Sequence, residues 1–351
     1  MKLTRLAVLT LALVAPALRG QAQQMRSTPA ASHVARGAAV AAVTAIALTV
    51  SDVDRSVAFY TSVLRFEKVA DTVVASEGYG RLQGVPGSRI RVVRLRLGDE
   101  SLQLMAWGEL RGRPAPADAR SNDRWFQHVA IIVSDMDSAY AVLQAHRVRP
   151  VSPAPQRLPD WNPNASGIRA FYFRDPDSHP LEVLQFPPGK GDPKWQRAKG
   201  RLFLGIDHTA IVVQDTEASL RFYRDLLGLR IAGKSLNYGP EQERLNNVPG
   251  ARLRITSLRA PGGRGPGIEF LEYLSPHDGR PAPADERAND LVHWQTLVAS
   301  ADLAGLATRL TTAGAQFVSP GVVRVEDRAL GFDRGFLVRD PDGHVVQVVA
   351  P

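Results

Sequence analysis

Short apolar runs alternate along this chain with stretches in which apolar residues recur at helical spacing. The runs Ala45–Val50 and Ile206–Val213 predict buried strands, and a predicted helix follows each of them. After the second run, Asp215 and Thr216 are capping candidates and Gly228 suits the end of a helix. Three further strand-like runs come after each helix. The local order is therefore one strand, one helix and three strands.

The same order starts again at His128 and at Trp294. Helices are predicted over Met136–Ala145 and Leu303–Ala313, and the last strand of each follows an Asp-Pro-Asp turn. The chain is thus predicted to consist of four βαβββ modules, which we name modules one to four in chain order.

Long repeats relate the two halves of the chain. Arg81–Arg96 reads RLQGVPGSRIRVVRLR and Arg244–Arg259 reads RLNNVPGARLRITSLR, while RPAPAD occurs at Arg113–Asp118 and at Arg280–Asp285. Modules three and four therefore repeat modules one and two, and this repetition decides the architecture.

Two of the modules carry a histidine and a glutamate at matching points. Gln127–Asp135 reads QHVAIIVSD and Asp207–Asp215 reads DHTAIVVQD, so each has a histidine in second place. Glu182 and Glu269 stand at matching points of later strands, and the sister modules lack all four residues. One histidine on an apolar strand is more often a core residue, but buried carboxylates need partners. The four together indicate one metal site, with nitrogen and oxygen ligands because the chain has no cysteine.

The first residues resemble an export signal. Lys2 and Arg5 precede the apolar run Leu6–Ala17, and small residues then offer a cleavage point. This run is too short to span a bilayer. We expect a signal peptide at 1–22, a flexible tether at 23–41, and an exported protein, periplasmic or secreted, that is not inserted in the membrane after the signal is removed.

The formal net charge is +8, but the arginines are scattered and form no dense basic run. This pattern is typical of a basic surface rather than of nucleic-acid binding. The expected partner is a small-molecule substrate.

Taken together, the motifs resemble those of the vicinal oxygen chelate superfamily, which includes glyoxalase I, bleomycin-binding proteins and extradiol dioxygenases. The similarity rests on Phe59-Tyr60 and Phe222-Tyr223 in the first helices, the HxAIxV strand, and the Asp-Pro-Asp turn before the last strand. It implies an α+β fold in which four βαβββ modules form two curved, half-open mixed sheets with helices outside.

The same resemblance implies the domain boundaries. Residues 42–187 are expected to form a first domain from modules one and two, 188–203 a linker, and 204–351 a second domain from modules three and four.

In that family each module offers one metal ligand from its first strand and one from its last. The resemblance therefore implies His128 and Glu182 from module two, and His208 and Glu269 from module three. The matching positions in modules one and four hold Ala45, Gln103, Gln295 and Gln347, with His293 nearby as a decoy or partial substitute. Two imidazoles and two carboxylates suit one divalent ion such as Zn, Ni, Co, Mn or Fe.

The ligand set depends on which modules share a sheet. If modules two and three pair, one sheet holds all four ligands. If module one pairs with two and three with four, each sheet has one histidine, one glutamate and two weak positions. We favour the first arrangement because it gives a complete site.

Several functions fit such a site. The first is a glyoxalase-like lyase or isomerase, in which Glu182 or Glu269 moves a proton on the carbon next to a carbonyl of a substrate with adjacent oxygens. Export disfavours a glutathione substrate. The alternatives are an Fe(II) extradiol-type dioxygenase, a non-catalytic protein that binds a small molecule such as an antibiotic, and a hydrolase or transferase using metal-bound water.

Two loops are expected to shape the pocket, Gln156–Gly167 and Leu236–Asn247. Within them, Trp161 and Tyr238 could stack on a ligand and Arg244 could hold an anion, although loop aromatics are also often packing residues.

Overall fold

The computed structural model describes residues 40–197 and 200–351 of the chain. The predicted signal peptide and almost all of the predicted tether lie outside the described residues. The first strand already begins at Val40, inside the range expected for the tether. In the described part of the chain, no helix combines the length and the apolar character needed to cross a membrane.

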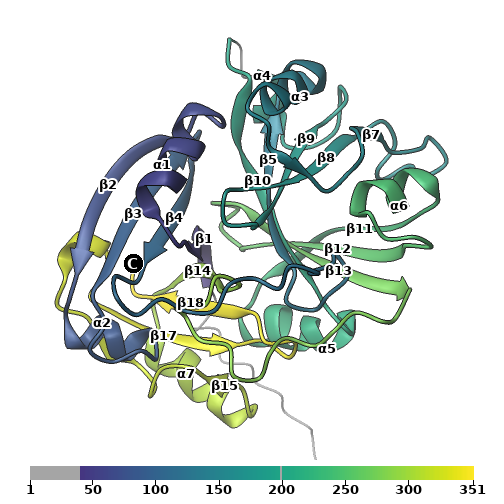
Figure 1. The fold of residues 1–351 in the computed structure, drawn as a ribbon. Helices are drawn as coiled ribbons and strands as arrows, with labels where there is room; N and C mark the ends of the chain where they lie inside the picture. The colour runs from purple at the N-terminus through teal and green to yellow at the C-terminus, as the bar shows by residue number, and fades with distance from the viewer. Residues whose placement is uncertain (1–39, 198–199) are drawn as a thin grey trace, which may run out of the picture. The chain divides into compact units, whose positions relative to one another are not determined.

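The strands form two open, mixed sheets of nine strands each (Figure 1). The sheet that we call sheet B has the order β11-β12-β13-β10-β5-β9-β8-β6, with β7 added beside β8. Its strands are β5 (Gln127–Val133), β6 (Arg149–Pro150), β7 (Gln156–Arg157), β8 (Arg169–Arg174), β9 (Pro180–Gln185), β10 (Phe203–Val212), β11 (Arg230–Tyr238), β12 (Arg252–Arg259) and β13 (Gly267–Ser275). Sheet B therefore joins modules two and three through the antiparallel pair β5 and β10.

Sheet A joins modules one and four. Its order is β15-β17-β18-β14-β1-β4-β3-β2, with β16 beside β17. Its strands are β1 (Val40–Thr49), β2 (Glu67–Val74), β3 (Ile90–Leu97), β4 (Glu100–Ala106), β14 (Trp294–Ser300), β15 (Gln316–Phe317), β16 (Val323–Arg324), β17 (Arg334–Arg339) and β18 (Val345–Val349). The expected pairing of modules two with three is thus confirmed, as are the α+β class and the two mixed sheets.

One helix follows the first strand of each module, as expected, and further helices occur elsewhere in the chain. They are α1 (Val53–Ser62), α2 (Glu77–Leu82), α3 (Met136–Ala145), α4 (Pro193–Arg197), α5 (Thr216–Leu220) continued by the π-helix η1 (Arg221–Leu226), α6 (Pro240–Asn246), α7 (Leu303–Thr312) and the 3₁₀ helix η2 (Arg328–Leu330). An aspartate shortly after the first strand of every module caps the helix that follows, accepting a bond from a backbone N–H of the first turn. These N-caps are Asp52, Asp135, Asp215 and Asp302. Gly228 has φ 83° just after η1, as expected for a helix end.

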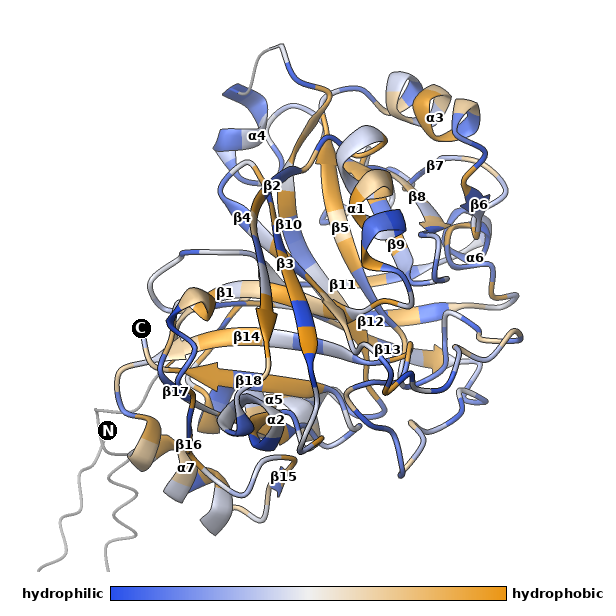
Figure 2. Cartoon of the chain, turned by 60° about the vertical axis from the view of Figure 1, so that its left-hand side comes forward, coloured by the Kyte–Doolittle hydropathy of each residue, from blue (hydrophilic) through white to orange (hydrophobic). Residues whose placement is uncertain are grey.

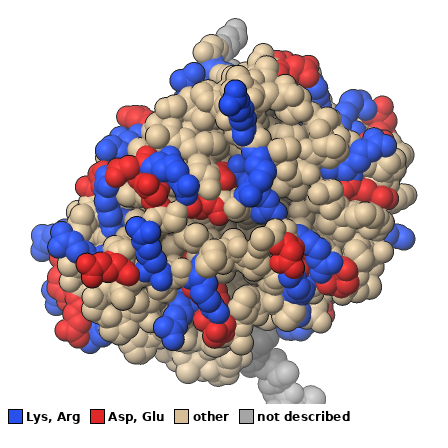
Figure 3. All heavy atoms as spheres, viewed as in Figure 1, with Lys and Arg blue, Asp and Glu red and all other residues tan. Residues whose placement is uncertain are grey.

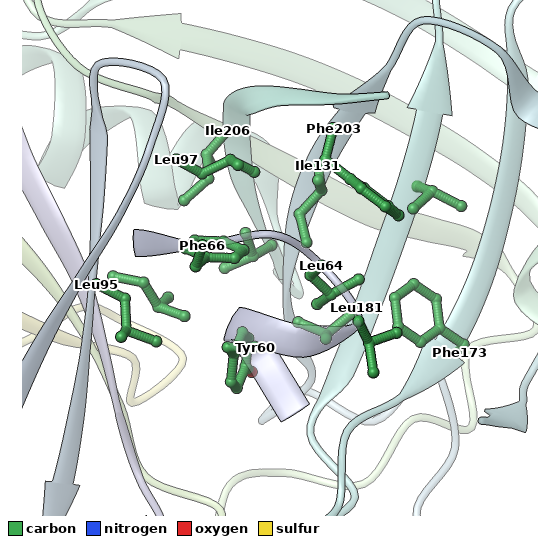
Figure 4. Close-up of a cluster of buried hydrophobic side chains, with 14 of the residues drawn as sticks. Tyr60, Leu64, Phe66, Leu95, Leu97, Ile131, Phe173, Leu181, Phe203 and Ile206 are labelled. Atoms are coloured by element: carbon green, nitrogen blue, oxygen red, sulfur yellow. The ribbon is translucent and has the colours of Figure 1, made fainter. Parts of the chain in front are cut away.

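The apolar strands of both sheets stand out in Figure 2. On the helix side, the core follows the chain order: one cluster joins modules one and two and another joins modules three and four. Figure 4 shows the first cluster, in which Tyr60 and Phe66 of module one lie near Phe173 and Leu181 of module two. The sheets thus join module two with three and module one with four, whereas these core clusters join module one with two and module three with four. The segment expected to be a linker contains α4, whose Trp195 is buried.

Motif residues that recur in both halves of the chain are joined by hydrogen bonds. The Tyr60 hydroxyl donates to Asp175 Oδ2 at 3.2 Å, and the Tyr223 hydroxyl donates to Asp340 Oδ2 at 3.1 Å. Each bond links the first helix of one module to the Asp-Pro-Asp turn of the next. Both tyrosines are buried in the core and also donate to a buried carboxylate. His179 Nδ1 lies 2.9 Å from the same Asp175 oxygen.

Basic and acidic side chains are interspersed over the face shown in Figure 3, without a continuous basic band across it.

Candidate metal centre

The four predicted ligands lie on one face of sheet B because of its strand register. On neighbouring strands, Glu182 of β9 is level with Ala130 of β5, which is level with His208 of β10. Two residues along, His128 of β5 is level with Ala210 of β10, which is level with Glu269 of β13. The positions between the ligands are alanines, so their small side chains leave room above the sheet.

Three of the four ligands converge. His128, Glu182 and His208 are buried, and each offers a ligand atom within 4.8 Å of the others. Glu182 Oε2 lies 3.2 Å from His128 Nε2 and 3.8 Å from His208 Nε2. Although the first distance is short, the geometry forms no hydrogen bond: within the described residues, both ring nitrogens of His128 and Nε2 of His208 have no hydrogen-bond partner.

Unpartnered buried nitrogens of this kind fit a metal. A buried polar atom without a partner costs stability, and a divalent ion bound by one nitrogen of each neutral imidazole and by a carboxylate oxygen would remove this cost at His128 Nε2 and His208 Nε2. Zn, Ni, Co, Mn or Fe all accept such a donor set. Metal binding by these residues stays a prediction, but their donor atoms suit a divalent ion.

Asp207, which the sequence reasoning did not single out, orients His208. A shift in the pairing of β10 with β5 between Ile206 and His208 marks a β-bulge at Asp207. Adjacent residues of a regular strand point to opposite faces, and the bulge relieves this alternation. Asp207 Oδ2 then lies 3.0 Å from His208 Nδ1, which leaves Nε2 facing Glu182 and Glu269. A carboxylate behind a histidine is the usual way to fix the ring of a metal ligand.

Asp207 is itself held in place from two sides. Its Oδ1 accepts hydrogen bonds from Trp195 Nε1 at 3.2 Å and from an Arg259 nitrogen at 2.9 Å. Burial raises the pKa of Asp207, but its bond and charge interaction with His208 and the charge of Arg259 outweigh this and lower it below the usual value. Asp207 is therefore a stable anion behind the ring.

The protonation of His208 reflects the surrounding carboxylates. Burial lowers the pKa of His208, but the charges of Glu269, Asp207 and Glu182 together outweigh burial and raise it to about 9. In the absence of a metal the site therefore holds a proton on this ring, which offsets part of the negative charge that three carboxylates bring together.

Glu269 lies beside the three converging residues rather than among them. Its Oε1 is 3.7 Å from His208 Nε2, while its Oε2 accepts a hydrogen bond from Ser257 Oγ at 2.7 Å. The Glu269 side chain is 18% exposed and that of Glu182 is 5% exposed. Glu269 thus combines closeness to the site with access to the space above it.

That space is a cavity of about 370 Å³ on the same face of sheet B. Glu182, His208 and Glu269 form its polar floor together with Asp207 and Ser257. The remaining wall is partly apolar and partly amide, and includes Leu158, Ile168, Tyr172, Leu245, Leu271, Asn164, Asn237 and Gln242. The cavity is large enough for a small organic substrate.

Tyr172 closes one side of the site. Its ring centroid lies 4.8 Å from that of His128, and burial raises its pKa well above the usual value. It is therefore a neutral, packed side chain that limits how His128 can turn.

The three predicted substrate-binding residues lie away from this wall. Trp161 and Tyr238 stack on each other with ring centroids 4.2 Å apart, and they are 49% and 43% exposed. Arg244 is exposed on α6. None of the three is among the residues that line the cavity. Their contact with a substrate stays a prediction.

In sheet A, the positions equivalent to the predicted ligands hold side chains that bond to one another. Gln295 and Gln347 stand where sheet B has His128 and Glu182, and Gln83, which follows the last residue of α2, bonds to both: it accepts from Gln295 and donates to Gln347 Oε1 at 3.1 Å. Leu297 replaces Ala130 in the row between Gln347 and Ala45.

The decoy His293 belongs to the same closed arrangement. Its Nδ1 is bonded to Glu286 and its Nε2 lies 2.8 Å from Gln295 Nε2. These amides are bonded mainly to one another, so they leave no donor set comparable with that of sheet B.

Sequence reasoning missed Asp207, Ser257 and Gln83. Differences between the repeats could have pointed to these residues. Asp207 of module three stands where module two has Gln127. Ser257 and Asn246 of module three stand where module one has Arg94 and Gln83. Only the structure shows which of these differences touch the site.

Comparison with known proteins agrees with this geometry. The sequence profile of the family described as "Glyoxalase/Bleomycin resistance protein/Dioxygenase superfamily" matches residues 42–183 and 205–348. A 2-epi-5-epi-valiolone epimerase from Actinomyces sp is 31% identical over 165 residues, which are 45% of this chain and 85% of the epimerase.

Solved structures share the fold. Glyoxalase I from Zea mays superposes with a TM-score of 0.59 at 14% identity, covering 89% of this chain and 93% of that one. A putative dioxygenase from Bacillus subtilis gives a TM-score of 0.54 at 14% identity, covering 89% and 86%. At such identities the likeness concerns the fold alone. The family match covers most of the chain in both halves, and the chain belongs to the Glyoxalase/Bleomycin resistance protein/Dioxygenase superfamily.

Proposed function

We propose that this protein is a divalent-metal-dependent isomerase that moves a proton on a carbon next to a carbonyl of a small substrate with adjacent oxygens. One observation carries the proposal: two carboxylates, Glu182 and Glu269, lie at equivalent positions of modules two and three, 3.8 and 3.7 Å from the same nitrogen of His208. The epimerase name of the 31% identical relative supports this class of reaction.

The residues have separate tasks in this proposal. His128, His208 and Glu182 hold the ion, because they converge and are buried. The ion, when bound, would hold the two substrate oxygens and offset the negative charge that develops as a proton leaves the neighbouring carbon. Glu269 takes the proton, since it faces the cavity and Ser257 holds only one of its two oxygens.

The return of the proton decides the product. A carbon bound between Glu269 and Glu182 has a carboxylate on either side. If Glu269 gives the proton to the former carbonyl carbon while the hydroxyl proton passes to the former carbonyl oxygen, the substrate isomerises. If Glu182 starts protonated and gives its proton to the opposite face of the carbon that lost its proton, the substrate is epimerised; the abstracted proton then stays on Glu269, and exchange with water resets both carboxyl groups. Apolar wall residues such as Leu158 and Leu271 keep water from the exposed anionic carbon.

The experiment has two parts. The full chain, purified without chelator, should contain about one ion by elemental analysis; His128→Ala should lose it and Gln295→Ala, its counterpart in sheet A, should keep it. In D₂O, NMR should then show deuterium entering small α-hydroxycarbonyl compounds. Glu269→Gln should keep the ion and lose this exchange, whereas Gln103→Ala should keep both. Absence of any ion after reconstitution, or exchange that survives in Glu269→Gln, would overturn the proposal.

One observation favours a second function. The three residues that converge are two histidines and one carboxylate, which is the ligand set of Fe(II) oxygenases. Oxygen uptake by the Fe(II)-loaded chain with catechols, and no exchange with hydroxycarbonyl compounds, would favour an extradiol-type dioxygenase. Saturable ligand binding with neither activity would instead indicate a binding protein.

We also propose that the protein is exported, on the basis of the basic and apolar pattern of residues 1–22. Fractionation of cells that express the full chain, with mass analysis of its N-terminus, tests this.

A further inference from the structure

Sheet A carries a cavity of its own, of about 420 Å³, on the face that corresponds to the metal-site face of sheet B. Ala45 and Gln103, the counterparts of His208 and Glu269, form part of its floor. Leu297, Leu330 and Phe332 add an apolar wall. The loss of metal ligands from modules one and four has therefore not removed the space above their sheet.

Arg94 of β3 is one of two arginines that line this cavity, the other being Arg264. It is half-buried, and the register places it level with Gln103 of β4. Its Nη1 would lie 3.7 Å from a Cβ on Gly331, so the guanidinium reaches the loop that covers the cavity. Within residues 40–197 and 200–351, Arg94 forms no hydrogen bond or ion pair. A guanidinium that lines a cavity without a protein partner can pair there with an anionic ligand.

The repeat shows that this charge replaces the metal chemistry. Arg94 occupies the position of Ser257, which in module three donates to Glu269. At the same face, module one has an amide for that carboxylate and an alanine for His208. One sheet thus presents carboxylates that attract a cation, and the other presents a guanidinium that repels one.

The two acidic side chains that line this cavity are already engaged or solvated. Glu100 is bonded to Lys194 through Oε1, and its Oε2 accepts from the backbone N–H of Ile206 at 3.1 Å. The side chain of Asp99 is 87% exposed and lies 3.7 Å from the Lys194 ammonium. Neither therefore neutralises Arg94, while Arg264 at the rim adds further positive charge.

We propose that the cavity of sheet A binds a small organic oxyanion, a carboxylate or a phosphate with an apolar body. The Arg94 guanidinium pairs with two oxygens of the anion, as its planar fork allows. The Gln103 amide donates to the anion, and the apolar body packs against Leu297, Leu330 and Phe332. This second ligand site is separate from the metal-site cavity and goes beyond the proposed isomerase function.

The test is calorimetric titration of the full chain with benzoate, phenyl phosphate, acetate and inorganic phosphate. We expect saturable binding of benzoate or phenyl phosphate, with the smaller anions weaker; which of the two aromatic probes binds better tells carboxylate from phosphate. Arg94→Ser, which installs the residue of module three, should weaken binding at least tenfold. Arg96→Ser, on the same strand and face but ion-paired to Glu67 at 2.7 Å, should not.

Two further variants separate this site from the metal centre and from misfolding. His128→Ala should leave anion binding unchanged, because it removes only a ligand of sheet B. Phe332→Ala should weaken the aromatic probes and leave inorganic phosphate unchanged. No saturable binding of any probe by the wild type, equal affinity in Arg94→Ser, or loss of binding in His128→Ala would each overturn the proposal.

Discussion

Asp207→Asn is the sharpest test of how the candidate metal centre is oriented. The change keeps the size of the side chain and removes the charge that faces His208 Nδ1 at 3.0 Å. Replacing such a partner of a metal-binding histidine typically costs about 10- to 100-fold in metal affinity, or roughly 1.4–2.7 kcal/mol. We expect the upper part of this range, because Trp195 and Arg259 hold the carboxylate in one place.

The pH dependence of this loss has a definite sign. The pKa of metal-free His208 is raised to about 9, so a cation competes with a proton for the ring below that pH. The affinity of the wild type should therefore rise as the pH rises toward 9. Asparagine lacks one of the charges that raise this pKa, so the variant loses its proton at lower pH. The deficit of Asp207→Asn should be largest near pH 9 and smaller at pH 7.

Competition with a fluorescent zinc chelator at both pH values measures these affinities. Thr44→Ala is the matched control, because Thr44 stands at the corresponding bulge of β1 before Ala45. It should bind zinc as the wild type does. Equal zinc affinity of Asp207→Asn and the wild type at pH 9 would refute the orienting role of Asp207.

Three other outcomes are expected. His208→Ala should abolish metal binding while Gln347→Ala keeps about one ion per chain by elemental analysis, and the reverse would place the site in sheet A. Tyr60→Phe and Tyr223→Phe each remove a donor to a buried carboxylate, so urea unfolding should show a loss of about 1.5–3 kcal/mol; no loss in either would mean that these bonds add no stability. Burial lowers the pKa of His179, but the adjacent carboxylate raises it above 6.5 overall. The contribution of protonated His179 to the free energy of unfolding is thus complete below pH 6.5 and is lost as the pH rises through its folded pKa. In urea unfolding measured from pH 6 to 9, His179→Gln should show a smaller fall in this free energy than the wild type.

The sequence was sufficient for the module order and for three converging side chains. Duplicated segments show equivalent positions directly, and strand alternation then places His128, Glu182 and His208 on one face. The cap at Asp215 could be predicted in the same way, since an aspartate after an apolar strand can accept a bond from the first turn of a helix.

Other contacts depend on geometry that alternation does not reveal. The bulge at Asp207 brings its carboxylate against the neighbouring His208 ring, and no residue type in the sequence predicts a bulge there. Gln83 reaches Gln347, 264 residues later in the chain, because sheet A joins the first module to the last. The partner of Tyr60 lies 115 residues away, in the turn of another module. Such pairs need the tertiary arrangement before they can be found.

The pairing of modules also determines the order in which the protein can be assembled. All strands of sheet B lie between Gln127 and Ser275, whereas sheet A takes β1–β4 from before that segment and β14–β18 from after it. During synthesis, the sheet with the histidines can therefore close while β1 still presents an unpaired edge. That edge stays unpaired until β14 is made and pairs with it, and the Thr44 hydroxyl then donates to the carbonyl of Leu297, 253 residues later in the chain. Closing so large a loop is slow. We therefore expect misfolding and aggregation of this chain to begin most often at the unpaired edge of β1.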